Sequence, residues 1–317
     1  MNTHLLCLTV DTDPDGLSGK VTNRQALKWD GLENLQRLLE ETKPCPLLPE
    51  IPITWFVRAD GQLESILGDA SYLLHKYDSW WSNVRNAGHE IAWHPHLYRQ
   101  SRSEDEVVII NDPAEAKDEL ERLWTNVRTS LRATSFRNGE GWHTQETYAT
   151  VERLGFLCDS TAIPGRIGGA GHPMNWEGAP NRPYFPSPAD LRKAGPLRAL
   201  LELPMNTWVV KAPYDAAPLI RYINPAVHPK IFAKALQNWE NTRKFLPYEL
   251  HISVMIFHPD EVLATQGEDQ LYSRSAAALC SNLVSFNESL QRVGIDAEWV
   301  TLSQAAERWR RHQGQPG

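Results

Sequence analysis

Apolar residues follow two patterns along most of the chain. Short runs of apolar and β-branched residues predict buried strands, and longer segments with apolar residues three or four positions apart predict helices. The predicted strands cover residues 4–10, 51–57, 89–94, 134–137, 156–160, 200–205, 250–257 and 297–302. Helices are expected over or within residues 31–41, 72–88, 112–131, 144–155, 224–242, 273–294 and 303–312.

The alternation of these strands with helices indicates a parallel sheet in an α/β protein. We expect a distorted (β/α) barrel of seven or eight parallel strands, with a doubly wound open sheet as the alternative. No GxGxxG or GxxxxGK[ST] motif follows the first strand, which removes the usual support for that alternative. A Gly- and Pro-rich stretch at about 164–196 is too long for a simple connection. We therefore expect a single domain over residues 1–317 with a loop-rich insertion.

The composition is typical of a globular protein, with 41% hydrophobic and 22% charged residues. A net charge of -7 argues against a nucleic-acid partner, and no window has the ~20 apolar residues of a membrane span. The first residues lack the basic segment of a secretion signal, so we expect a cytoplasmic protein. The four cysteines form no CxxC or CxxH pair, which predicts reduced thiols. The 12 tryptophans slightly favour a carbohydrate-like ligand, although core packing explains most of them.

Residues that can carry chemistry follow four of the predicted strands. The carboxyl ends of the strands in a parallel barrel share one rim, where catalytic groups gather. We therefore expect two carboxylates, three imidazoles and a guanidinium to face one another. Asp11 and Asp13 follow the first strand, His94 and His96 the third, Arg137 the fourth and His258 the seventh.

Such a set suits hydrolysis assisted by a metal ion. A carboxylate and two imidazoles can hold a divalent ion, with zinc favoured and cobalt or nickel as alternatives. The ion polarises a carbonyl group and lowers the pKa of its bound water toward ~7. A second carboxylate can accept the water proton, and another histidine can protonate the leaving group.

These segments, taken in order, resemble the polysaccharide deacetylase family, the NodB-homology domain of carbohydrate esterase family four. The resemblance is carried by VDTD, AGHEIAWH, SFRNGEGW with VERLGFLCDS, and MIFHPDE, which span nearly the whole chain. It implies a distorted barrel of the NodB-homology type and the removal of an acyl group. By position it makes Asp11 the base, Asp13 and His94 metal ligands, Arg137 the cation that orients the base, and His258 the acid.

The second motif departs from the family pattern, in which the two histidines are four residues apart. Tyr98 occupies the position of the second histidine, and His96 is the available substitute. Pro95 biases His94 toward an extended conformation, in which side chains two residues apart share a face. We therefore expect Asp13, His94 and His96 to hold the ion, with Tyr98 as the alternative.

The leading hypothesis is a hydrolase that uses a metal-bound water to remove an acetyl or formyl group from nitrogen in an acylated sugar or oligosaccharide. Some relatives have lost metal ligands, so a metal-independent hydrolase of cyclic amides or ureides is the second hypothesis. A catalytically silent carbohydrate-binding relative is the third. The hypotheses share a sugar-like or other small-molecule ligand, no nucleic acid and no membrane span, and leave open a homo-oligomer.

Each of these residues also has a structural explanation. The sequence DTDPDG is strong turn chemistry, and an arginine such as Arg137 often forms surface ion pairs. The functional interpretation depends on the coincidence of four strand ends, not on any one of them. We expect His89 to satisfy local hydrogen bonds near the start of its strand and His251 to lie within a strand, and no second feature favours function at His143, His172 or His251.

Overall fold

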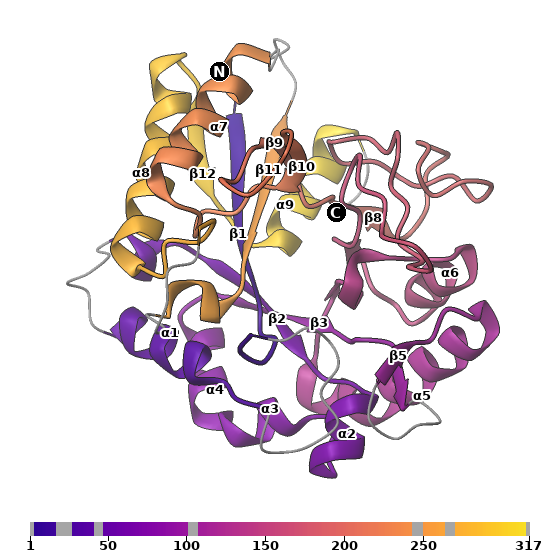
Figure 1. Cartoon of the computed structure of the whole chain (residues 1–317). Helices are drawn as coiled ribbons and strands as arrows, with labels where there is room; N and C mark the ends of the chain where they lie inside the picture. Colours follow the sequence, from indigo (N-terminus) through magenta and orange to yellow (C-terminus); the bar gives the residue numbers. More distant parts are fainter. Residues whose placement is uncertain are drawn as a thin grey trace.

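A computed structural model describes residues 3–16, 27–40, 47–100, 107–242, 250–263 and 270–314 of the 317-residue chain. Its main feature is a parallel sheet that curls around a central core, with the helices outside it (Figure 1). The strands in spatial order are β11 (His251–Phe257), β1 (Thr3–Asp11), β2 (Ile53–Arg58), β3 (Glu90–His94), β6 (Ser135–Phe136), β7 (Cys158–Asp159) and β8 (Leu201–Glu202). An eighth strand, β12 (Asp296–Trp299), pairs with the first half of β1. The eight predicted strands and their parallel arrangement are confirmed.

The sheet is a half-barrel with an open seam between β8 and β11. Among the described residues no backbone pairing joins these two strands directly. Asn206, which follows β8, bridges part of the gap, because its backbone N–H donates to the Val254 carbonyl at 3.2 Å. The Asn206 side-chain oxygen also accepts from the Val254 N–H at 2.7 Å. The expected distorted barrel is therefore confirmed in this incompletely closed form.

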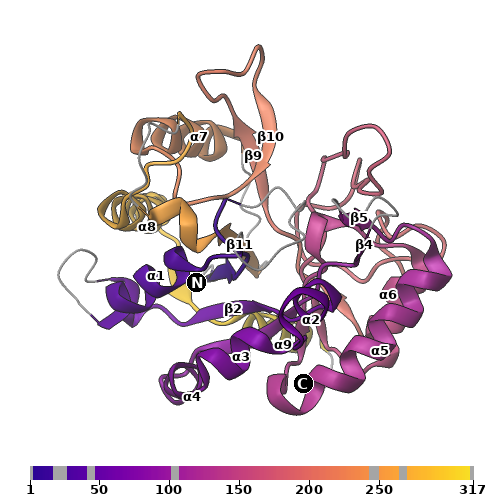
Figure 2. The same cartoon turned by 60° about the horizontal axis from the view of Figure 1, so that its bottom comes forward.

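Helices surround the outer face of the sheet, as the two views in Figures 1 and 2 show. They are α1 (Asp30–Glu40), α2 (Gly61–Leu67), α3 (Tyr72–Lys76), α4 (Asp78–Asn86), α5 (Pro113–Leu131), α6 (Gln145–Arg153), α7 (Pro229–Thr242) and α8 (Ala276–Arg292). The last helix, α9 (Leu302–His312), instead packs its buried residues against the apolar side chains of the inner face. Local signals set their ends. Asp112 caps α5 by accepting from the Glu115 N–H at 2.8 Å, and Pro113 occupies the first turn.

Some short elements were not predicted from the sequence. The hairpin strands β4 (Tyr98–Gln100), β5 (Val107–Ile109), β9 (Thr207–Val210) and β10 (Leu219–Tyr222) have three or four residues each. Segments this short do not show a reliable period of two. Helix α2 was also not predicted, although Asp60 carries a visible N-cap signal and accepts from the Leu63 N–H at 3.0 Å.

Two apolar clusters fill the molecule. The inner cluster takes one face of the strands, for example Leu5 and Cys7 of β1, together with residues of α9. The outer cluster takes the other face, for example Leu6 and Leu8, and packs it against the surrounding helices. This alternation follows from the period-two geometry of a strand. Among the described residues, no helix is both long and apolar enough to cross a membrane.

The cysteines behave in two ways. Cys7 and Cys158 are buried free thiols, and burial raises the pKa of each well above the usual range. Cys280 is disulfide-bonded, and Cys45 lies outside the described residues. The expectation of reduced thiols is therefore confirmed for Cys7 and Cys158 and wrong for Cys280.

Candidate metal site

Strand alternation places the site residues on the inner face of the half-barrel. Leu5 and Cys7 belong to the inner cluster, and Asp11 follows at two-residue steps at the end of β1. In the same way Ala92 belongs to this cluster and His94 follows it at the end of β3. Because the strands are parallel, these ends share one rim, and the side chains converge there.

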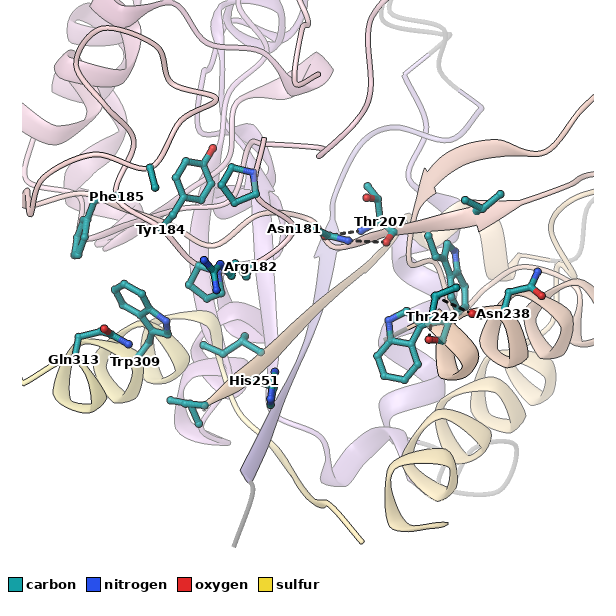
Figure 3. A pocket seen from close by; sticks show the side chains of 18 of the residues that line it. Asn181, Arg182, Tyr184, Phe185, Thr207, Asn238, Thr242, His251, Trp309 and Gln313 are labelled. Carbon is teal, nitrogen blue, oxygen red and sulfur yellow. Dashed lines mark hydrogen bonds between the residues drawn. The ribbon is translucent and has the colours of Figure 1, made fainter. Parts of the chain in front are cut away.

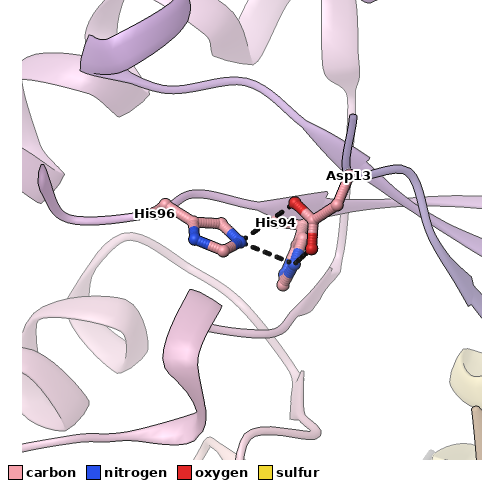
Figure 4. Close-up of side chains that lie close together, drawn as sticks. All are labelled: Asp13, His94 and His96. Carbon is pink, nitrogen blue, oxygen red and sulfur yellow. Dashed lines mark hydrogen bonds and ion pairs between the residues drawn. The ribbon is translucent and has the colours of Figure 1, made fainter. Parts of the chain in front are cut away.

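Three side chains at this rim are arranged as a metal-binding group. The ligand atoms of Asp13, His94 and His96 all lie within 4.8 Å of one another (Figure 4). Asp13 Oδ1 is 3.1 Å from His96 Nε2, and the two Nε2 atoms of His94 and His96 are 3.2 Å apart. Within the described part of the chain this is the one group of three such residues that could hold an ion.

The protonation of His94 supports a metal at this point. His94 Nδ1 lies 2.9 Å from the backbone carbonyl oxygen of Arg137, so this nitrogen carries the proton. In a neutral ring the lone pair is then on Nε2, which faces Asp13 and His96. A carboxylate and two imidazole nitrogens, with a carbonyl orienting one ring, are a typical ligand set for zinc or a similar ion. The residues present therefore fit a divalent ion.

Tyr98 takes a different direction from the two histidines. Its hydroxyl donates to the Glu140 carboxylate, and it is not part of the metal-binding group. The ring of His96 packs against Gly139, where an added Cβ would lie only 2.3 Å from a ring carbon. A side chain at this position would displace His96, so the glycine that follows Arg137 and Asn138 makes room for the substitute ligand.

Arg137 binds the Asp11 carboxylate directly. Arg137 donates from one terminal nitrogen to Asp11 Oδ1 at 2.6 Å and to the Thr9 hydroxyl at 3.0 Å. Its other nitrogens donate to the Ser160 carbonyl and hydroxyl oxygens at 2.9 and 3.0 Å. Asp11 Oδ2 remains 3.6 Å from His94 Nε2, beside the metal-binding group. The arginine is fully buried and fixes the carboxylate at the rim.

His258 approaches Asp13 from the end of β11. Its Nε2 is 3.5 Å from Asp13 Oδ2, and its Nδ1 is 3.4 Å from Glu261 Oε1. Glu261 also accepts from the His258 N–H at 3.0 Å and from the Asn224 side-chain amide at 2.7 Å. The imidazole is thus oriented by a carboxylate, with its Nε2 edge facing the rim.

Charges at the rim shift several pKa values. Burial alone would raise the pKa of Asp13, but His96, His258 and His94 hold it well below the usual range. Burial would lower the pKa of His94, but Asp11 and Asp13 outweigh it and raise that pKa. The rim therefore attracts positive charge between the carboxylates.

Several residues of the site were not predicted from the sequence. Arg58 ends β2, donates to Asp13 Oδ1 at 3.1 Å and pairs with Asp60 at 2.7 Å. Asp60 accepts from the His96 backbone N–H at 3.1 Å and so holds that segment in place. His172, at which no second feature favoured function, lies at the same rim, with its Nε2 3.3 Å from Glu140 Oε2. Arg58 and Asp60 follow a predicted strand and could have been found by the strand-end argument. Glu140 lies in the short 3₁₀ turn Gly139–Gly141 and His172 on a loop, so neither follows a strand directly and the argument could not find them.

A cavity of about 410 Å³ opens over the metal-binding group. The insertion at 164–196 forms one wall, which includes Arg166, His172 and Met174. Asp11, Arg137 and His258 also line this cavity, so all six predicted site residues meet there. Its volume lies within the range of sites for small ligands.

A larger cavity, of about 1030 Å³, lies at the seam beside the start of β11 (Figure 3). His251 lines it, at the opposite end of the strand from His258. Aromatic and amide side chains form its walls, among them Trp309 and Asn181. Thr242 and Leu250 form one side, and residues 243–249 between them are outside the described part of the chain. Trp93, Trp142 and Trp176 are core residues, each at most 2% exposed, while Trp208, also mostly buried, lines this cavity.

Comparisons with known proteins find similar structures for this chain but no similar sequences. No family model matches the sequence, and no curated protein matches it. A candidate polysaccharide deacetylase from Mycobacterium smegmatis is 18% identical, with a TM-score of 0.51 over 99% of this chain and 92% of that one. A candidate glycoside hydrolase/deacetylase from Parabacteroides distasonis is 15% identical, with a TM-score of 0.58 over 98% and 71% of the two chains. The Puue allantoinase is 12% identical, with a TM-score of 0.51 over 97% and 90%. Over nearly its whole length the chain therefore has the fold of the polysaccharide deacetylases, as the sequence motifs indicated.

Proposed function

We propose that this protein is a metal-dependent hydrolase that removes an acetyl or formyl group from nitrogen in a sugar or sugar-like molecule. The observation that carries the proposal is the convergence of Asp13, His94 and His96, with a held carboxylate and a held imidazole beside them. The fold likeness to deacetylases agrees with this chemistry but does not by itself assign it.

Asp13, His94 and His96 would hold the ion, and zinc suits one oxygen and two nitrogen ligands, with cobalt or nickel as alternatives. When bound, such an ion supplies a Lewis acid for the acyl carbonyl and lowers the pKa of water. The three residues leave open ligand positions, as catalytic rather than structural sites do.

Asp11 and His258 would carry out the two proton transfers of the reaction. Asp11 accepts the proton of the attacking water, because Arg137 fixes its carboxylate at the rim and leaves Oδ2 facing the site. His258 donates a proton to the departing amine nitrogen as the carbon–nitrogen bond breaks, and Glu261 keeps its ring oriented for this. The surroundings of His258 favour this assignment: burial would lower its pKa, but the Asp13 and Glu261 carboxylates outweigh that effect and raise the pKa well above its usual value.

The small cavity favours a compact substrate. A volume of about 410 Å³ suits one or two sugar rings, and the insertion at 164–196 covers one side. We propose a free or carrier-linked acylated sugar or a short oligosaccharide as the substrate. The cytoplasmic location stays a prediction.

Metal analysis combined with release of acetate or formate from a panel of N-acyl sugars tests the proposal. We expect about one divalent ion per chain and activity that is lost on chelation and restored by zinc or cobalt. His96→Ala should lose both metal and activity. A metal-free protein that is inactive on the whole panel would refute it.

A second candidate is a metal-independent hydrolase of cyclic amides or ureides. It is favoured by the Arg58 guanidinium, which lies 3.1 Å from Asp13 Oδ1 and could take the place of a cation there. An allantoinase shares the fold, although at 12% identity this likeness concerns the fold alone. On this hypothesis chelators leave activity intact and His96→Ala has only a mild effect.

A further inference from the structure

We propose that Glu140 is a positioning residue for His96, with its carboxylate accepting the proton on Nδ1 of the imidazole while Nε2 binds the metal ion. The inference rests on the metal site of the proposed function. Neither the sequence motifs nor the structural comparisons assign a role to Glu140.

The ring of His96 needs a hydrogen-bond acceptor on its far side. Its Nε2 faces Asp13 Oδ1 at 3.1 Å and His94 Nε2 at 3.2 Å, which is the edge that would bind an ion. A neutral imidazole that uses Nε2 as a ligand carries its proton on Nδ1. That nitrogen is buried, and no hydrogen bond reaches it from the described residues. Metal-binding histidines almost always donate this proton to a carboxylate, a carbonyl or water.

Glu140 provides the carboxylate that His96 lacks. Its Oε1 is 3.9 Å from His96 Nδ1, so a shift of about 1 Å would form a hydrogen bond. The same oxygen accepts from the Tyr98 hydroxyl, and Oε2 lies 3.3 Å from His172 Nε2. The carboxylate is therefore held beside the ring by two other side chains.

The backbone conformation of Gly139 and Glu140 also brings the Glu140 carboxylate close to His96. Glu140 has a left-handed conformation with φ of 60°, which is unusual for a residue other than glycine. Gly139 before it leaves room for the ring of His96, as an added Cβ would collide with that ring. Tyr98 occupies the position at which the polysaccharide deacetylase family has its second histidine. In this chain Tyr98 holds the carboxylate that supports His96, the substitute ligand. The replacement of the second histidine by Tyr98 and the use of His96 as a ligand therefore depend on each other.

The affinity of the full-length protein for Co²⁺, measured by competition with a chromophoric chelator, tests the proposal. Glu140→Gln keeps the shape and an oxygen for Tyr98 but removes the carboxylate charge. We expect its Kd for Co²⁺ to rise by about 10- to 100-fold, the usual effect of removing such a partner. Glu146→Gln removes the same charge from an exposed position on α6 and should bind Co²⁺ like the wild type.

Two further measurements separate positioning from a general structural role. NMR of the zinc-loaded protein with ¹⁵N-labelled histidine should show a hydrogen-bonded Nδ1–H on His96 in the wild type, and a weaker hydrogen bond in Glu140→Gln. Tyr98→Phe, which leaves Glu140 in place but removes one of its holders, should weaken Co²⁺ binding by a smaller factor and serves if Glu140→Gln fails to fold.

Equal Co²⁺ affinity in the wild type and Glu140→Gln would overturn the inference while leaving the proposed function intact. If Glu140→Gln does not fold, unchanged affinity in Tyr98→Phe overturns it. A wild type that binds no Co²⁺ would reject the metal-dependent function and this inference together.

Discussion

Two groups of acids and imidazoles lie in this half-barrel, and only one of them can bind a metal. At the rim, Asp13, His94 and His96 point ligand atoms at one another beneath an open cavity. Within the wall, Asp159 and Glu202 are fully buried, and Asp159 Oδ2 is 3.1 Å from His143 Nε2. The two groups have nearly the same chemical composition.

The difference lies in access, because the cavity over the rim is lined by Asp13, His94 and His96 and by no member of the buried group. In the buried group, Asp159 Oδ1 accepts from the Thr161 hydroxyl at 2.6 Å, and Glu202 Oε1 accepts from the Ala162 N–H at 3.0 Å. Nδ1 of His143 lies 2.9 Å from the Thr147 hydroxyl oxygen. The remaining polar atoms, His143 Nε2, Asp159 Oδ2 and Glu202 Oε2, are buried and accept or donate no hydrogen bond among the described residues, although the first two lie 3.1 Å apart. A functional site is therefore recognised by convergence and access, not by residue types alone.

Asp11→Asn should have the largest effect, because it removes the proposed base while keeping the shape of the residue. We expect kcat/KM on the best N-acyl sugar to fall by about 10²- to 10⁴-fold. Metal content, measured on the same preparations, should stay that of the wild type. Near wild-type turnover would show that Asp11 is not the base.

Arg137 connects the two groups, because it binds Asp11 on one side and Ser160, next to Asp159, on the other. Arg137→Met leaves the buried Asp11 carboxylate without its close ion-pair partner and with only His94 at 3.6 Å beside it, so we expect the free energy of unfolding to fall by about 3–5 kcal/mol. Urea denaturation of the metal-free protein measures this.

Arg122 provides the matched control for Arg137, because it is an exposed arginine that pairs with Glu64 at 2.7 Å and with Glu119 at 2.8 Å. Arg122→Met should cost at most about 1 kcal/mol, as is usual for exposed ion pairs. Similar losses in the two variants would contradict the role given to the buried arginine.

His143→Phe tests the buried group with little change in volume. It leaves Asp159 Oδ2 without its partner, so we expect a loss of about 1–3 kcal/mol in unfolding free energy. The affinity for zinc should not change. A variant with wild-type stability but weakened zinc binding would contradict the assignment of a structural role to the buried group.

Glu202→Gln should have a smaller effect that depends on pH. Burial and the charge of Asp159 raise the pKa of Glu202 well above its usual value. The folded protein then keeps a proton that the unfolded chain releases above pH ~4.3, so the stability contributed by Glu202 falls as the pH rises toward the folded pKa.

Glutamine does not titrate, so Glu202→Gln should gain unfolding free energy relative to the wild type as the pH rises, by up to about 1.4 kcal/mol per pH unit. Urea unfolding of both proteins at a series of pH values measures the difference. Parallel pH profiles would show that Glu202 does not hold the proton.

Sequence patterns predicted the long elements and the four strand ends, because strand and helix periods and the parallel topology are local and regular. The same argument brought Asp11, Asp13 and His258 to one rim, where the structure places them. No comparable pattern predicts where loop residues lie in the fold. Glu140 reaches the site only through the backbone conformation after Gly139, and His172 through the path of the insertion, neither of which is written in a periodic pattern.

Anomalous scattering at the zinc edge, from crystals of the zinc-loaded protein, tests the central claim most directly. We predict one strong peak bound by Asp13, His94 Nε2 and His96 Nε2 at about 2.0–2.2 Å, with Tyr98 remaining on Glu140. A peak bound by the Tyr98 hydroxyl instead of His96, or no peak at this rim, would contradict the account.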